Sequence, residues 1–142
     1  MNATNTLRDL IKKHEGTKKK NGRHILYKCS ANKWTCGWGR NCDDKGFSRD
    51  EVELMLTNDI QEAGEGAISI FPDLYKYTTN RQNALIDMCF NLGKSRLLRF
   101  KKMIAAVKEG DWKEAAAQAR DSAWHTQVGL RATEIEKMLE EG

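Results

Sequence analysis

One acidic residue stands where it could take part in catalysis. Glu15 lies at the end of an amphipathic segment and is followed by a stretch of β-type sequence, residues 25–39. A carboxylic acid on a rigid helix, facing a small sheet that presents a second reactive group, is suited to cleaving the bond between two sugars. That reaction needs one group to protonate the leaving oxygen and another to bring water or a nucleophile to the anomeric carbon.

The helix that would hold Glu15 has a start and a stop in the sequence. Thr6, with Asp9 three residues later, is a variant of the capping box and predicts that the helix begins there. Gly16 is a residue type that commonly ends a helix. The pattern therefore predicts a helix from Thr6 to about Glu15.

The segment after this helix changes character twice. Residues 18–22 are polar and are expected to form a loop. Residues 25–39 mix β-branched and aromatic residues with turn formers, which predicts a small antiparallel sheet. Gly37 and Gly39 within it mark bends or a close approach of the backbone.

A long helix should follow the sheet. Ser48 and Glu51 form a capping box, and apolar residues continue the helical pattern towards Gly64 or Gly66. A helix of this length can bridge two lobes.

The rest of the chain is predicted to be helical. Thr79 should cap a helix that ends at Gly93, and its apolar face suggests a central core helix, with Ala84, Leu85, Met88, Cys89 and Leu92 inward. Further helices are expected over residues 97–110, Trp112 to about Arg120, and about Leu130 to Leu139, with a turn at 121–125. The fold class is therefore α+β and mainly α.

Size and charge limit the possible functions. The 142 residues suffice for one compact domain, or for two small lobes that share a helix. The net charge is +4, and seven cations crowd the first part of the chain: Arg8, Lys12, Lys13, Lys18, Lys19, Lys20 and Arg23. They form either a solvated face with a basic loop or a surface for a polyanion, such as nucleic acid, an acidic membrane or an acidic wall polymer.

The four cysteines do not have the spacing of a structural zinc site. Cys29, Cys36 and Cys42 lack paired two-residue spacings, and Cys89 lies in an apolar helical stretch typical of a core. Synthesis in a cytosol favours free thiols, whereas work outside the cytosol would permit a bridge such as Cys36–Cys42.

Neither a membrane span nor an export signal is expected. The sequence has no run of about 18 apolar residues, and Met1 to Asn5 lack the regions of a secretory signal. The chain is expected to be made in a cytosol and to stay there unless something else releases it.

Five blocks of sequence are spread in order over nearly the whole chain: His14–Gly16; Tyr27–Cys29 followed by Thr35–Gly39; Asn83–Gly93; Gly110–Trp112; and Asp121–Trp124, which continues to Gln127 and Arg131. Together these blocks resemble the phage-type lysozymes of glycoside hydrolase family 24. These muramidases serve phages to break host peptidoglycan.

The resemblance implies a single two-lobed, lysozyme-like domain over residues 1–142. A small β-sheet lobe, about residues 15–60, would be joined by the long helix to a helical lobe of about residues 1–14 plus 65–142. The glycan cleft would lie between the lobes. The implied enzyme is an endolysin that hydrolyses the β-1,4 bond between N-acetylmuramic acid and N-acetylglucosamine, without a cofactor or a metal, for host lysis and phage release.

The resemblance also assigns the catalytic residues. Glu15 matches the general acid of the family. Cys29 matches a position, six residues before a threonine, that holds aspartate in most relatives and cysteine in some, and Thr35 is that threonine. Its hydroxyl could orient the attacking water. Cys29 and Thr35 could also be ordinary packed residues of a sheet.

A cysteine at this position changes the chemistry. A thiol with the usual pKa of about 8.5 is mostly neutral at pH 7. We expect Lys28 or the basic loop to lower the pKa of Cys29 and so favour a thiolate, whose charge would oppose the oxocarbenium-like transition state. Oxidation or disulfide pairing of Cys29 would then silence the enzyme.

Other residues are assigned by the same resemblance. Phe90 matches an aromatic residue at the cleft wall, Gln118 an amide that holds sugar, and Arg131 an arginine near the catalytic glutamate. Trp124 is expected to be structural, whereas Trp34 and Trp38 could stack on sugars or pack in a core.

Three rival functions remain open at this level. A lytic transglycosylase would also use one glutamate, but the spacing of Cys29 and Thr35 favours water as the nucleophile. The interpretation as a nucleic-acid-binding module is supported only by the basic cluster. The interpretation as an inactive wall-binding protein leaves Glu15 without a role. We expect a monomer that acts on peptidoglycan strands in the periplasm, without binding nucleic acid or inserting stably in a membrane, after release by a separate pore-forming protein.

Overall fold

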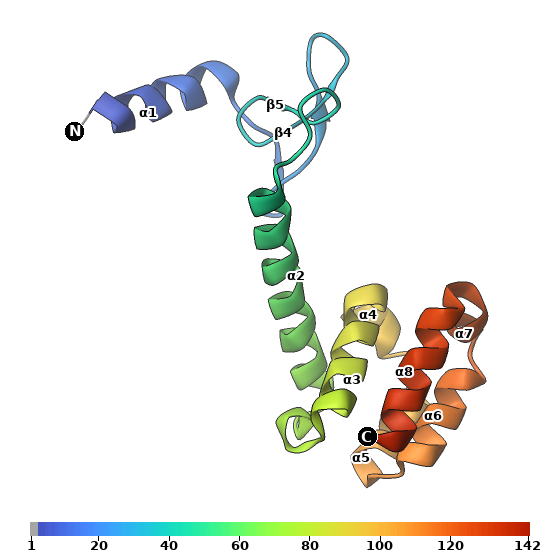
Figure 1. Cartoon of the computed structure of the whole chain (residues 1–142). Coiled ribbons are helices and arrows are strands. Elements are labelled where there is room, and N and C mark those ends of the chain that lie inside the picture. Colours follow the sequence, from blue (N-terminus) through green and yellow to red (C-terminus); the bar gives the residue numbers. More distant parts are fainter. Residues whose placement is uncertain (1–2) are drawn as a thin grey trace. The chain divides into compact units, whose positions relative to one another are not determined.

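The computed structural model describes residues 3–142, with side chains from Thr6 onward. Met1 and Asn2, the start of the segment expected to lack an export signal, lie outside the described residues. The chain forms two compact units, Met1–Glu53 and Leu54–Gly142, which are described separately. Helices dominate, and the short strands all lie in the first unit, which confirms the mainly α, α+β class (Figure 1). Inclusion of residues 1–14 in the helical lobe stays a prediction.

The first unit combines one helix with two small antiparallel sheets. Helix α1 spans Ala3–Glu15, so it begins before Thr6, and the capping box predicted at Thr6 was wrong. The first sheet pairs β1 (Lys19–Lys20) with β2 (Arg23–His24), and the second has the order β3 (Tyr27–Lys28), β4 (Trp34–Cys36), β5 (Arg40–Asn41). The second sheet confirms the prediction for residues 25–39.

The predicted loop at residues 18–22 is instead half of a β-hairpin. Its turn is Asn21-Gly22, and both residues have positive φ, 51° and 76°. Asn-Gly is the dipeptide preferred in two-residue hairpin turns, because both central residues need that backbone conformation. The sequence therefore contained the information, and reading the segment by its polarity alone missed it.

Helix α2 (Arg49–Ile70) starts with the predicted capping box. The Ser48 backbone N–H donates to Glu51 Oε1 at 2.8 Å, and the Glu51 N–H donates to Ser48 Oγ at 3.2 Å. The helix does not stop at Gly64 or Gly66 but continues to Ile70. A side chain at Gly66 would meet Cys89 Sγ at 2.9 Å, so this glycine permits close packing rather than ending the helix.

The second unit is a helical bundle. After a short 3₁₀ turn (η1, Leu74–Lys76) it contains α3 (Thr79–Leu92), α4 (Lys94–Leu97), α5 (Lys101–Glu109), α6 (Trp112–Arg120), α7 (Ala123–Val128) and α8 (Leu130–Glu141). Helix α6 packs on α5 and α8, and α3 packs on α4 and α8 (Figure 1). The predicted inward face of α3 is confirmed, since all five of its residues are buried.

Three boundaries in this unit differ from the prediction. Residues 97–110 were expected to form one helix, but the chain turns between α4 and α5. Residues 121–125 were expected to be a turn, but Ser122 caps α7 by accepting from the His125 N–H. The cap of α3 is Thr78 rather than Thr79.

Candidate active site

The Glu15 side chain lies against the turn between β4 and β5. A methyl group built on Gly39 would come within 2.6 Å of Glu15 Oε2 and 2.7 Å of its carboxyl carbon. A side chain at Gly39 would have to displace the carboxyl group of the exposed Glu15 side chain, which confirms that Gly39 marks a close approach to the backbone. Gly37 has no such neighbour within 4 Å and serves as a bend, with φ of 56°.

Cys29 lies in the turn between β3 and β4 rather than in a strand. Its backbone N–H donates to Lys33 O at 2.9 Å, and its carbonyl accepts from the Asn32 N–H at 2.9 Å. Register pairs Tyr27 with Thr35, and side chains alternate between the faces of a strand. Cys29 and Thr35 therefore share one face of the sheet.

The surroundings of Cys29 favour its thiolate form. The backbone N–H of Lys33 lowers the pKa of this thiol most, and the N–H of Ala31 and the Thr35 hydroxyl lower it further against an opposing effect of burial. Hydrogen bonds to the ionised form have this effect because they stabilise the negative charge. The lowered pKa agrees with our expectation, but its cause does not.

Lys28, which was expected to lower the pKa of Cys29, is not among the causes. Its ammonium group lies 4.3 Å from the centre of the Trp34 ring and 3.5 Å from Asn32 O. Lys28 thus contacts the strand and the turn, and the pKa of Cys29 is lowered chiefly by backbone N–H groups.

Thr35 is the buried member of the site. It is only 3% exposed, and its hydroxyl donates to Lys33 O at 3.0 Å. A hydroxyl has one proton to donate, so donation to the Cys29 sulfur requires that it turn away from Lys33 O. Ionisation of Cys29 would favour that rotation.

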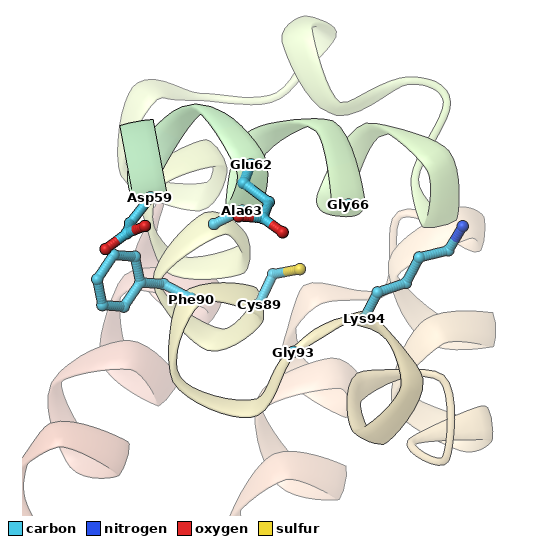
Figure 2. Close-up of a pocket in the computed structure, with 8 residues that line it drawn as sticks. All are labelled: Asp59, Glu62, Ala63, Gly66, Cys89, Phe90, Gly93 and Lys94. Atoms are coloured by element: carbon cyan, nitrogen blue, oxygen red, sulfur yellow. The ribbon is translucent and has the colours of Figure 1, made fainter. Parts of the chain in front are cut away.

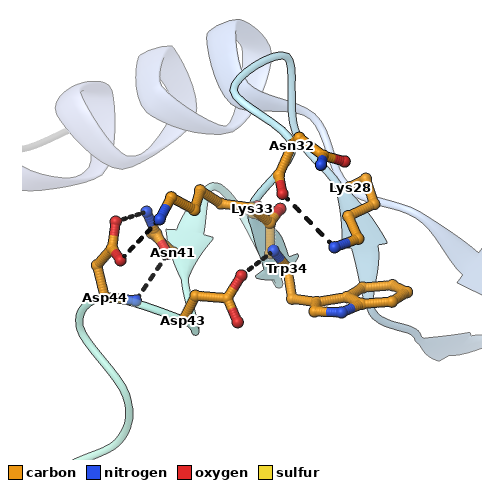
Figure 3. A network of polar contacts seen from close by, with 8 residues as sticks. Lys28, Asn32, Lys33, Trp34, Asn41, Asp43 and Asp44 are labelled. Atoms are coloured by element: carbon orange, nitrogen blue, oxygen red, sulfur yellow. Dashed lines mark hydrogen bonds and ion pairs between the residues drawn. The ribbon is translucent and has the colours of Figure 1, made fainter.

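A polar network holds the strands on which these groups lie (Figure 3). Lys33 pairs with Asp44 at 3.1 Å, Asp44 also accepts from Asn41 Nδ2 at 2.9 Å, and the Trp34 N–H donates to Asp43 at 2.8 Å. The Asp44 partners lower the pKa of that carboxyl, Lys33 first and Asn41 next. The network joins β4 to the segment after β5 and so fixes the register at Thr35.

The register also relates Glu15 to Thr35. Thr35 is opposite Asn41, and Gly39 lies two residues before Asn41. The Glu15 carboxyl therefore lies against the turn that joins the strands carrying Thr35 and Asn41.

Two exposed tryptophans flank this part of the first unit. Trp34 is 44% exposed and Trp38 is 40% exposed, so neither is packed in a core of this unit. Lys12 lies 4.4 Å from the centre of the Trp38 ring. Arg40 pairs with Glu51 and donates to Gly46 O at 3.1 Å, so it joins the sheet to the start of α2.

In the helical unit, Phe90 borders a hollow of about 360 Å³ between α2 and α3. Figure 2 shows Phe90 beside Asp59 at one end of the hollow, Lys94 at the other and the Cys89 sulfur between them. The ring of Phe90 is 41% exposed, so it is available for a sugar to stack on.

The other two predicted site residues of this unit are held by neighbours. Gln118 donates to Glu114 at 2.7 Å and lines a different hollow from Phe90. Arg131 Nε donates to Asp87 Oδ1 at 2.7 Å. The structure does not bring Gln118 and Phe90 into one pocket. Their roles in sugar binding stay predictions, as does the role of Arg131 beside the acid.

Trp124 has the structural role expected of it. It is 3% exposed, and its indole N–H donates to Asn91 at 2.9 Å. Local sequence patterns do not reveal the partners Asn91 and Asp87, because each meets its partner across at least 33 residues of chain.

A model of the phage lysozyme family matches residues 12–137, a range that contains every predicted site residue. The chain belongs to this family. It is 36% identical over 64 residues to "Probable T4-type lysozyme 2" of Dictyostelium discoideum, covering 45% of this chain and 38% of that protein.

Two further relatives are matched over a larger and a smaller share of their length. "Probable T4-type lysozyme 1" of the same organism is 30% identical over 95 residues, 65% of this chain and 56% of that protein. The pre-baseplate central spike protein Gp5 of Enterobacteria phage T4 is 35% identical over 60 residues, 42% of this chain and 10% of that protein. The chain thus spans at most little more than half the length of these relatives.

Proposed function

We propose that the chain is a muramidase that hydrolyses the β-1,4 bond between N-acetylmuramic acid and N-acetylglucosamine in bacterial peptidoglycan. The observation that carries this proposal lies within Met1–Glu53. The Glu15 side chain lies against a turn of the small sheet, and Cys29 and Thr35 share one face of that sheet. Membership of the phage lysozyme family supports the reaction class.

The reaction divides between these three residues. Glu15 donates its proton to the bridging oxygen while the bond to the anomeric carbon breaks, and a water molecule attacks that carbon. The Thr35 hydroxyl orients the water. The Cys29 thiolate accepts the proton that the water loses and places negative charge near the oxocarbenium-like transition state.

Each unit, taken by itself, offers side chains that could contact sugar. The exposed ring of Phe90 supplies a stacking surface, and the Gln118 amide supplies hydrogen bonds once its bond to Glu114 is exchanged. The exposed indole rings of Trp34 and Trp38 supply further apolar surface for sugar.

The biological role follows from the substrate. The enzyme would act as a monomer on wall strands, serving host lysis and phage release, and would reach the periplasm through a pore made by another protein. Within residues 3–142, no helix is both long enough and apolar enough to cross a membrane.

Product analysis on purified peptidoglycan tests the proposal. Hydrolysis leaves new reducing ends at N-acetylmuramic acid, and Glu15→Gln should remove them while circular dichroism stays unchanged. Anhydro-muramic products would instead show a lytic transglycosylase, and wall binding without cleavage an inactive binding protein. Full activity of Glu15→Gln would overturn the assignment of the acid.

A further inference from the structure

The sheet of the first unit brings two thiols together on the face opposite Cys29 and Thr35. Cys36 pairs in register with Arg40, and the Cys42 N–H donates to Trp34 O at 2.8 Å, so Cys36 and Cys42 are diagonal neighbours across β4 and β5. Their sulfur atoms lie 2.8 Å apart. A disulfide bond is about 2.05 Å long, so the sulfurs need to approach by only about 0.8 Å.

Neither thiol is sealed in a core. Both side chains are half-buried, so a small oxidant can reach them. Burial, followed by the hydrogen bond and charge of Cys42, raises the pKa of Cys36 to about 11. Cys36 therefore holds little thiolate near neutral pH, and the thiolate is the nucleophile.

We propose that Cys36 and Cys42 form an oxidation site, which becomes a disulfide in an oxidising compartment and fixes the turn against which the Glu15 carboxyl lies. The bond would close the segment from Cys36 to Cys42, which contains Gly39. The Glu15 carboxyl rests on that glycine. The structure therefore links this thiol pair to the position of the acid rather than to the thiol at Cys29.

The oxidant is a small-molecule disulfide or the disulfide of an oxidoreductase. The Cys42 thiolate attacks one sulfur of that disulfide, forms a mixed disulfide and expels the first thiolate. The Cys36 thiolate then attacks the Cys42 sulfur and expels the second. Two electrons pass to the oxidant, and the two protons of the cysteines end on the two thiols released.

The remaining cysteines are poorly placed to compete. Strand alternation puts Cys29 on the other face of the sheet, where backbone N–H groups of Ala31 and Lys33 favour its thiolate. Cys89 is 4% exposed within α3 of the helical unit. The pairing is thus specified by the sheet.

Tryptic mapping of the full chain can read the pairing directly, because every cysteine falls in a tryptic peptide of its own. We would incubate the protein with oxidised glutathione, block free thiols and digest without reductant. The expected product joins Trp34–Arg40 to Asn41–Lys45, with Cys29–Lys33 unlinked. A link from Cys29 to either peptide, or no link at all, would overturn the proposal.

Two further measurements test the order of attack and the effect on the fold. With glutathione disulfide, Cys36→Ser should form a mixed disulfide faster than Cys42→Ser.

The oxidised protein should melt several degrees above the reduced protein, and this difference should vanish in the double serine variant. Equal melting of both redox states would refute the stabilising role. None of these readouts depends on glycan cleavage, so the proposed enzyme activity can fail separately.

Discussion

The carboxyl group of Glu15 occupies the space that a side chain at Gly39 would fill. The two residues are joined by contact alone, since a methyl group there would lie 2.6 Å from Glu15 Oε2. The turn between β4 and β5 therefore limits the positions that the Glu15 carboxyl group can adopt. Among the described residues of the first unit, this close approach is the restraint on the acid.

Gly39→Ala should displace the acid and reduce the turnover of peptidoglycan by about 100-fold, because a shift of about 1 Å in a reacting group can cost that much. Gly37→Ala is the matched control. Both positions have positive φ, 82° and 56°, but only Gly39 contacts Glu15. Each should lose about 1 kcal/mol of stability from the backbone. Equal loss of turnover in both variants would show that strain alone is responsible.

Thr35→Val should raise the pH at which Cys29 becomes reactive. The variant removes the hydroxyl that helps to lower the pKa of this thiol, whereas Thr35→Ser keeps it. The rate of alkylation by iodoacetamide, followed across pH by the mass of the peptide Cys29–Lys33, measures the change. An unchanged profile in Thr35→Val would mean that backbone N–H groups account for the whole effect.

Cys29→Asp should extend activity to lower pH. If the thiolate of Cys29 is the active form, activity rises as pH rises through its folded pKa, which lies below the ordinary value. An aspartate ionises near pH 3.9, so the acid limb of kcat/KM should move to lower pH. Ser30→Asp adds the same charge to the neighbouring exposed residue and should leave the limb in place. Identical profiles for wild type and Cys29→Asp would assign Cys29 a packing role.

Glu136→Ala should destabilise the helical unit by about 1–2 kcal/mol, because it removes the buried carboxylate that pairs with His125 and Arg120. Glu136 is 2% exposed and contacts His125 Nδ1 at 2.6 Å and Arg120 Nε at 3.6 Å. Glu134→Ala changes an exposed glutamate of the same helix and should cost less than about 0.5 kcal/mol. Urea unfolding of the two variants measures the difference, and similar midpoints would argue against a stabilising cluster.

The parts of the fold that could be predicted are those set by neighbours in sequence. The capping box of Ser48 and Glu51 and the buried face of α3 were predicted because both depend on residues three or four positions apart. The hairpin at residues 19–24 also had a local marker, Asn21-Gly22. Composition alone hides this marker, because the lysines around it have the polarity typical of a loop.

The parts that could not be predicted depend on contacts across the chain or on the backbone. Glycine is a residue type that commonly ends a helix, yet Gly66 lies within α2. Its missing side chain leaves room for the sulfur of Cys89 on another helix. The lowered pKa of Cys29 comes chiefly from a backbone N–H in a turn, a group that has no side-chain pattern. The family resemblance identified Cys29, but its environment could be learned only from the structure.

The basic hairpin of β1 and β2 should draw the enzyme to anionic walls. Residues 18–24 are all exposed and include Lys18, Lys19, Lys20 and Arg23. Neutralising Lys19 and Lys20 with glutamine should weaken binding to intact walls roughly tenfold at low salt, and added salt should remove the difference by screening. Stability should not change, because both side chains are exposed.

A matched pair of substitutions separates a local effect of this hairpin from one of net charge. Lys108→Gln with Lys113→Gln removes the same charge from exposed positions of the helical unit and should bind walls almost as wild type does. Cosedimentation with purified walls, before and after removal of their anionic polymers, measures both. An equal loss in the two double variants would assign the attraction to net charge. A loss confined to the hairpin variant, and abolished on stripped walls, would establish the hairpin as the docking element.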